Sequence, residues 1–301
     1  FELGFNGEKY ELILSAEGRR TGLFPLVYFQ RHAPKAVLEH WNILVGRQTS
    51  TGFSLRAGGM EIRSEDVQVW VEHKEDRVSL SLYCEKLLSL LKEDADRAWW
   101  LFYTLTDQAL GEISSIALIN DLVPVEQPKE GASVLLSELP QVLQNMGFAL
   151  WKDAQDYLDN SYISYELKPV EDPDADWRLD VYTGSARLPV LINEYMSAES
   201  DAADDYHKDG IVAGFLCYPL AGFEGEKRAE QILQFRDALQ GTIQEHAGDD
   251  AVTFLGGATG LYYGYLDLIA WDLPAVLDAA REFFAGANLT WGGFHVFRRE
   301  V

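Results

Sequence analysis

The fold of this protein is decided by residues 251–301, which read AVTFLGGATGLYYGYLDLIAWDLPAVLDAAREFFAGANLTWGGFHVFRREV. Two apolar runs, Val252–Leu255 and Leu261–Trp271, flank the glycine-rich segment 256–260. Because glycine readily adopts positive φ, we expect a hairpin turn at these glycines. Alternation along the second strand divides its side chains between two faces. One face carries Leu266, Leu268 and Ala270, and the other carries Tyr263, Tyr265, Asp267 and Ile269.

A helix and a last strand are predicted to follow this hairpin. Asp272 is a good N-cap, and Pro274 falls in the first turn, where a missing N–H costs nothing. Apolar residues recur at helical spacing up to Gly286, which ends the helix. Residues 294–297 form the returning strand. The stretch therefore predicts about half of a ferredoxin-like layer.

The glycine cluster Gly256-Gly257-Ala258-Thr259-Gly260 also invites comparison with a phosphate-binding loop. Such loops lead directly into a helix whose N-terminal amides face the anion. Here the glycines lead into another strand, and no Lys-Ser or Lys-Thr follows them. We interpret the cluster as a structural turn.

Length and composition indicate two α+β domains. A chain of 301 residues with 47% hydrophobic residues has enough apolar material for two cores. Prolines and a Gly between residues 124 and 131 interrupt the pattern, and a short helix then runs to Met146. We place the boundary near Gly147, which gives domains 1–147 and 148–301. Each domain is expected to be an antiparallel or mixed sheet covered by helices, in ferredoxin-like layers.

Periodicity, caps and breakers predict the other elements of both halves. In the first half we expect a hairpin over 67–84, a helix over 92–110 and a strand over 113–123. In the second half the expected strands are 161–167, 179–182 and 211–220, and the expected helices are 188–195 and 225–246.

The net charge of −23 argues against a nucleic-acid partner, since binding phosphates requires cations that displace counterions. It fits a basic protein partner, a cation or simple solubility. Residues 153–209 hold 15 Asp or Glu against 4 Lys or Arg, a net of 4 − 15 = −11. The negative charge is therefore concentrated early in the second domain.

The two cysteines and the absence of long apolar runs favour a cytoplasmic protein. Cys84 and Cys217 lie in apolar, strand-like runs, without zinc spacing or a disulfide framework. No apolar run approaches the ~18 residues of a membrane span. The chain begins with Phe1 rather than Met, which is compatible with removal of a leader.

Two groups of residues resemble known families. The first comprises His32-Ala33-Pro34, Glu39–Ile43, Glu65-Asp66-Val67, Asp107–Glu112 and a helix at Leu139-Pro140. It resembles bacterial α+β domains of unknown function, and no catalytic residues come with that resemblance. The second is Asn288-Leu289-Thr290-Trp291-Gly292-Gly293 within the closing unit. It is similar to the end of the ribonuclease E regulator B family, small acidic ferredoxin-like proteins that inhibit a nuclease by binding it. This chain lacks the acidic tail of that family. The resemblances imply the fold, a bacterial origin and a binding role.

Residues 201–210 are the first candidate site, with Asp205, His207 and Asp209 as its main residues. Three alternatives are open for this stretch: a solvated loop, a contact with a partner, or a loop that coordinates a divalent cation. The stretch lacks the alternating oxygen ligands and the closing Glu of an EF-hand loop. None of the six histidines has a spacing that would place two ligands on one helix face. We therefore expect no metal and no cofactor.

The second candidate site is the strand face of Tyr263, Tyr265 and Asp267, with His295 or Phe297 as neighbours on the last strand. If this face is open, its tyrosines and carboxylate can bind a ligand or a protein. The other alternative, which we favour, is that it packs against the first domain.

Two functional hypotheses follow, and neither rests on a catalytic motif. There is no Gly-x-Ser-x-Gly elbow, and neither cysteine has a histidine nearby in sequence. The preferred hypothesis is a non-enzymatic bacterial protein that binds or regulates a macromolecular partner through an acidic or aromatic surface; an immunity-type toxin inhibitor is a variant of it. The alternative is a small-molecule or metal-dependent enzyme with a site between the domains. That site would use Asp205, His207, Asp267 and His295.

Overall fold

The chain forms two compact units, Phe1–Asn160 and Ser161–Val301. This computed structural model describes residues 1–50, 52–57, 59–287 and 289–299. Both units combine helices with antiparallel or mixed sheets, so the predicted α+β class is confirmed. The division falls after helix α7 (Ala154–Asn160) rather than at Gly147, because α7 packs on other helices of the first unit through Tyr157 and Leu158.

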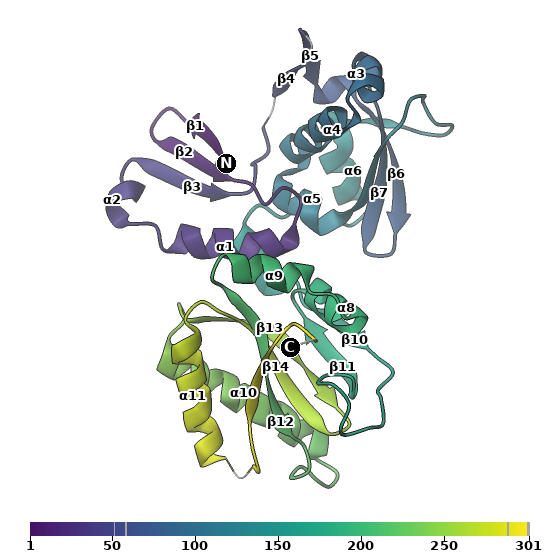
Figure 1. The fold of residues 1–301 in the computed structure, drawn as a ribbon. Coiled ribbons are helices and arrows are strands. Elements are labelled where there is room, and N and C mark those ends of the chain that lie inside the picture. The colour runs from purple at the N-terminus through teal and green to yellow at the C-terminus, as the bar shows by residue number, and fades with distance from the viewer. Residues whose placement is uncertain (51, 58, 288, 300–301) are drawn as a thin grey trace. The chain divides into compact units, whose positions relative to one another are not determined.

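The first unit contains three separate sheets among its described residues (Figure 1). Strands β1, β2 and β3 form one sheet, β4 and β5 a second, and the third has the order β8-β7-β6-β9. The strands are β1 (Glu2–Phe5), β2 (Tyr10–Leu14), β3 (Trp41–Val45), β4 (Ser54–Ala57), β5 (Met60–Arg63), β6 (Gln68–Lys74), β7 (Arg77–Tyr83), β8 (Ile119–Pro124) and β9 (Val134–Leu135). The helices are α1 (Arg20–Arg31), α2 (Lys35–Leu38), α3 (Leu88–Glu93), α4 (Ala95–Leu110), α5 (Glu112–Leu118), α6 (Leu139–Asn145) and α7.

The long helix α4 forms the core of this unit together with the β6–β7 hairpin, which was predicted over 67–84. Its start is capped by Asp94, whose carboxylate accepts a hydrogen bond from the backbone N of Arg97 at 3.1 Å. Gly111 ends it with a φ of +83°, as expected of a glycine after a helix.

The strand predicted over 113–123 is wrong in its first half, which is helix α5. Short apolar runs fit a helix as well as a strand, and here Ile113 and Ile116 are buried at helical spacing. Strand pairing begins only at Ile119, where β8 lies parallel to β7.

The second unit is built on one six-stranded antiparallel sheet with the order β10-β11-β13-β14-β12-β15. Its strands are β10 (Ile163–Glu166), β11 (Val181–Ala186), β12 (Val212–Pro219), β13 (Val252–Gly260), β14 (Tyr263–Ala270) and β15 (Gly293–Val296). Its helices are α8 (Pro189–Ser197), α9 (Asp201–Lys208), α10 (Arg228–Ala247) and α11 (Leu273–Gly286). The run β12-α10-β13-β14-α11-β15, with spatial order β13-β14-β12-β15, is the ferredoxin-like arrangement, extended by β10 and β11.

Helices α10 and α11 cover one face of this sheet (Figure 1). Leu266, Leu268 and Ala270 of β14 lie in that core, as the alternation predicted. The predicted cap of α11 is confirmed, because the side chain of Asp272 accepts a hydrogen bond from the backbone N of Ala275 at 3.1 Å.

The glycine cluster 256–260 is not the turn that we expected. It lies within strand β13, and the chain reverses after it, between Gly260 and Tyr263. Side chains are excluded there by close neighbours: an added Cβ would approach the backbone oxygen of Ser185 to 2.1 Å at Gly256 and the carboxylate of Asp180 to 2.1 Å at Gly260. These glycines therefore permit close strand packing rather than a hairpin turn.

Candidate functional site

The sheet face that bears Tyr265 and Asp267 is closed by a buried arginine, Arg178. This residue precedes β11, adopts a positive φ of +69° and is 0% exposed. Its guanidinium forms an ion pair with Asp267, which is itself 1% exposed. The same group donates a hydrogen bond to the Tyr165 hydroxyl at 3.0 Å.

Three aromatic rings complete the surroundings of this guanidinium. Its central carbon lies 5.0 Å from the ring centre of Phe215, 5.1 Å from that of Tyr265 and 5.3 Å from that of Phe297. Burial, the largest single influence, lowers the pKa of Arg178, but the charge and hydrogen bond of Asp267 together with Tyr165 and Tyr265 outweigh burial and raise that pKa. The guanidinium is therefore a permanent cation inside unit 2, neutralised by one carboxylate.

Asp180, two residues after Arg178, connects the β13–β14 turn to the polar network of Arg178 through hydrogen bonds. Its carboxylate accepts hydrogen bonds from the Tyr265 hydroxyl at 2.6 Å and from the backbone N of Tyr262 and Tyr263 at 3.0 Å each. Burial, followed by the charge of Asp180, raises the pKa of Tyr265, so this phenol stays protonated. Arg178, Asp180, Tyr265 and Asp267 are all buried, and their contacts join the residues that precede β11 to strand β14.

Tyr265 and Asp267 are buried, and the contacts described above for both side chains lie within unit 2. Tyr263 differs from them because it lies at the edge of the same face and is half-buried. Its ring meets Trp177, which follows the acidic connection, and Trp291, which precedes β15.

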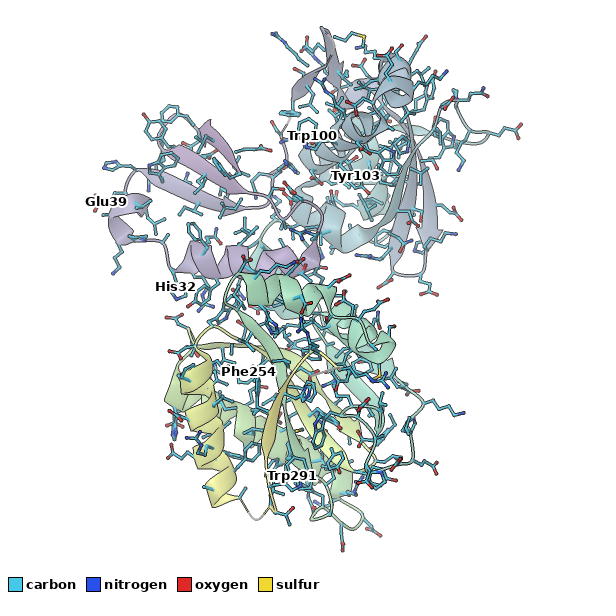
Figure 2. The ribbon with its side chains drawn as sticks, in the orientation of Figure 1. His32, Glu39, Trp100, Tyr103, Phe254 and Trp291 are labelled. Atoms are coloured by element: carbon cyan, nitrogen blue, oxygen red, sulfur yellow. The ribbon has the colours of Figure 1, made fainter. Side chains whose placement is uncertain are left out.

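Trp177, Tyr263 and Trp291 form a mutual cluster, which we call the aromatic trio. The ring centres are 5.1 Å apart for Trp177 and Tyr263, 5.4 Å for Trp177 and Trp291, and 5.6 Å for Tyr263 and Trp291. Trp291 is 37% exposed and the other two are partly exposed (Figure 2 labels Trp291). Three rings from separate segments therefore form a half-open aromatic surface, the composition typical of binding hot spots.

Carboxylates border the aromatic trio on one side. The Tyr263 hydroxyl donates a hydrogen bond to the carbonyl oxygen of Pro173 at 3.1 Å, which places the acidic connection beside the trio. Burial, with the charges of Asp180 and Asp174, raises the pKa of Tyr263. Four exposed carboxylates lie in this connection, which we call the acidic loop: Glu171, Asp172, Asp174 and Asp176.

The stretch 201–210 is not a loop but helix α9 followed by its C-terminal residues. Ala202, Ala203 and Tyr206 form its buried face, and acidic residues occupy its first turn, where they favour the helix dipole. Asp205 is exposed and pairs with Lys208 at 2.8 Å, while Asp209 is exposed at the C-cap. The cation-binding loop considered above is therefore absent here.

His207 is half-buried on α9, and its Nε2 has no hydrogen-bond partner among the described residues. Burial and the nearby charge of Arg298 lower the pKa of His207, so it is neutral at pH 7. Arg298 itself is held by Asp204. The position fits a packed imidazole better than a proton carrier.

His295 lies on the same sheet face as Asp267 but is separated from it by β12. Phe215 is paired with Asp267 on one side and with His295 on the other, so the two backbones are two strand spacings, about 10 Å, apart. The imidazole stacks on Phe215 at 5.5 Å, and its Nδ1 lies 2.7 Å from the Val296 oxygen. Of the residues of the enzyme hypothesis, Asp205, Asp267 and His295 are thus engaged in separate contacts.

A second polar cluster lies in unit 1 around Glu112, which is 0% exposed. Its carboxylate accepts hydrogen bonds from the backbone N of Ala16 at 2.8 Å and of Arg47 at 2.9 Å. The Arg47 guanidinium lies 3.1 Å from the Asp107 carboxylate and 2.7 Å from that of Glu2. Burial, and then the charge of Glu112, raise the pKa of Asp107 to about 7. This cluster joins β1 and the end of β3 to α4 and α5.

The described parts of the chain hold neither a cluster suited to a metal ion nor a helix suited to span a membrane. There, no three His, Cys, Asp or Glu side chains come together in a way that could hold a metal ion. No helix within the same residues has the length and apolarity needed to cross a bilayer.

Sequence reasoning named Tyr263 but missed its two tryptophan partners. Trp177 comes directly after the acidic run, and Trp291 lies in the Trp-Gly-Gly segment. In the sequence each is a single aromatic residue, and no pattern indicates that the two lie together. Their proximity depends on the β12–β15 pairing and on the Tyr263–Pro173 contact, which local periodicity does not encode.

Unit 2 is therefore an extended ferredoxin-like module with an aromatic and acidic surface and a sealed charge network. Comparison with protein-family models, curated proteins and solved structures found no match. The family resemblances remain predictions, and the function has to be argued from this surface.

Proposed function

We propose that this protein is a non-enzymatic binding or regulatory protein whose aromatic trio and acidic loop engage a basic protein partner. The observation that carries the proposal is the aromatic trio itself, because three partly exposed rings meet beside exposed carboxylates. Tryptophan and tyrosine supply large apolar contacts with little loss of side-chain entropy, and they dominate protein interfaces for that reason. The carboxylates supply attraction over a longer range and select a cationic partner.

The charge of the whole chain supports the same partner class. A net charge of −23 accelerates encounter with cationic surfaces and opposes encounter with phosphate backbones, so we propose no nucleic-acid partner. Location in the cytoplasm is part of the proposal, in keeping with two buried free cysteines, Cys84 and Cys217.

A catalytic role is disfavoured by the state of the candidate residues. Asp267 is buried against Arg178, and Asp205 pairs with Lys208 on the surface. His295 is stacked on Phe215. A general acid or base has to reach a substrate proton, and the contacts of these three side chains leave no shared position for one.

The test compares two tryptophan substitutions in the full chain, Trp291→Ala and Trp100→Ala. Trp100 is the matched control, because it is 53% exposed but lies on α4 of unit 1 (Figure 2). Fluorescence anisotropy would measure binding to short labelled peptides of equal length that carry net positive, zero or net negative charge.

We expect the wild type to prefer the cationic peptide, with binding that weakens as salt rises. Trp291→Ala should weaken this binding about tenfold or more, the effect of losing ~1.5 kcal/mol at a hot spot, and Trp100→Ala should leave it unchanged. Equal losses in the two variants, or no preference for the cationic peptide, would refute the proposal.

A further inference from the structure

The acidic loop already holds a cation of the chain's own, Arg299. Its Nε donates a hydrogen bond to the Asp176 carboxylate at 2.9 Å, and its Nη1 donates to the carbonyl oxygen of Met196 at 3.3 Å. Asp176 is the residue before Trp177, so this guanidinium is held one residue from the aromatic trio. The surface is thus observed in contact with an arginine side chain.

This internal contact is partly open to solvent. The Asp176 side chain is 56% exposed and that of Arg299 is 27% exposed. Ion pairs of this exposure contribute little to stability, because water screens them and two long side chains lose freedom. In contrast, the Arg178–Asp267 pair is 0% and 1% exposed and cannot exchange partners without opening unit 2. Arg299 can therefore be displaced while the fold stays intact.

We infer that Arg299 competes internally for the acidic loop, and that the partner presents an arginine side chain that displaces it. This inference rests on the proposed function and names the group that the surface recognises. The acceptors that hold Arg299, a carboxylate and a carbonyl, are met by two different nitrogens of one planar guanidinium. A lysine ammonium is a point charge and cannot span two such acceptors in the same way.

The aromatic trio adds a second reason for arginine. Guanidinium groups stack on aromatic faces more readily than ammonium groups do. The chain itself places Arg178 over Phe215 at 5.0 Å and Arg187 over Tyr162 at 4.6 Å. An arginine entering beside Trp177 can meet a carboxylate and a ring face together, so the partner is an arginine-bearing segment of a basic protein.

The test measures binding of labelled oligoarginine and oligolysine peptides of equal length to three forms of the full chain: wild type, Arg299→Ala and Arg281→Ala. Arg281 is the matched control, since it forms an exposed ion pair with Asp278 at 2.9 Å on α11 of the same unit. Each substitution removes one positive charge and one surface ion pair, so a general change in charge affects both variants equally.

We expect Arg299→Ala to bind oligoarginine about two- to fivefold more tightly than the wild type, and Arg281→Ala to bind it as the wild type does. We also expect oligoarginine to bind the wild type more tightly than oligolysine. If Arg299→Ala gains no more than Arg281→Ala, or if oligolysine binds equally well, the inference is overturned.

Failure of the proposed function gives a different result from failure of this inference. If the surface is not a binding site at all, Trp291→Ala binds oligoarginine as well as the wild type does. If only the competition is wrong, Trp291→Ala still weakens binding while Arg299→Ala fails to strengthen it beyond the control.

Discussion

The raised pKa of Asp107 predicts that Asp107→Asn stabilises unit 1 at alkaline pH. This carboxyl is 6% exposed, and burial together with the charge of Glu112 raises its pKa from 3.8 to about 7. Below pH 4 the carboxyl is protonated in both the folded and the unfolded chain and carries no penalty. As the pH rises towards 7, only the unfolded chain loses the proton, so the free energy of unfolding falls.

The magnitude follows from the size of the shift. A difference of 7 − 3.8 pH units, at 1.36 kcal/mol per unit, corresponds to about 4 kcal/mol of unfolding free energy lost above pH 7. The amide of Asn is neutral at every pH and of the same shape, so it removes this loss. The pKa of about 7 already includes the attraction of Arg47. Because the amide has one acceptor oxygen where the carboxylate has two, part of the gain is lost, and we expect a net gain of about 2–3 kcal/mol at pH 8 and little or none at pH 4.

The assay is urea unfolding at a series of pH values, with hydrogen exchange of α4 amides as the readout that reports on unit 1. Glu130→Gln is the control, because it removes one negative charge from an exposed position of the same unit. If Asp107→Asn is less stable than the wild type at pH 8, then the pairing of the ionised Asp107 with Arg47 outweighs the cost of burial and of the Glu112 charge. That result would refute the reasoning.

Two further predictions concern unit 2. Arg178→Met leaves the Asp267 carboxylate buried without its cation and should cost about 3–5 kcal/mol of unfolding free energy in urea titrations, while adding Asp267→Leu should restore much of that loss. A double variant as unstable as the single one would show that the charge pair is not the cause. Gly257→Ala brings a Cβ within 2.5 Å of a backbone oxygen of the neighbouring strand and should lower the free energy of unfolding by about 1–3 kcal/mol. Gly286→Ala, with no atom within 4 Å of the new carbon, should change it by less than about 1 kcal/mol in the same titrations, and equal effects at the two glycines would contradict the packing argument.

Local chemistry was sufficient to predict the second strand and the helix of the closing unit. The cap at Asp272, the alternation of Leu266 with Tyr265, and the helix up to Gly286 each depend on neighbours within a few residues. The same local reasoning failed at the glycine cluster, because the need for Gly256 comes from the Ser185 backbone on another strand.

The candidate site was harder to predict because it is made of residues far apart in the chain. Tyr263 could be selected from its strand face, but the trio exists only after residues 171–177 and 291 are brought to it. Arg178 had no sequence signature at all, since it stood as one basic residue within an acidic run. The stretch around Asp205 reads as a loop because most of its residues are charged. The few apolar residues that form the buried face of α9 are too short a pattern to indicate a helix.

The sheet of unit 2 is held by different chemistry on its two faces. The two faces should therefore tolerate substitutions differently. Under α10 and α11 the contacts are apolar and non-directional, so substitutions that conserve volume should be accepted there in many combinations. On the face of Arg178, the hydrogen bonds and the ion pair join specific partners, so a change at one position demands a matching change at another. Variation between versions of this protein should therefore be independent from site to site beneath the helices and strictly paired around the buried arginine.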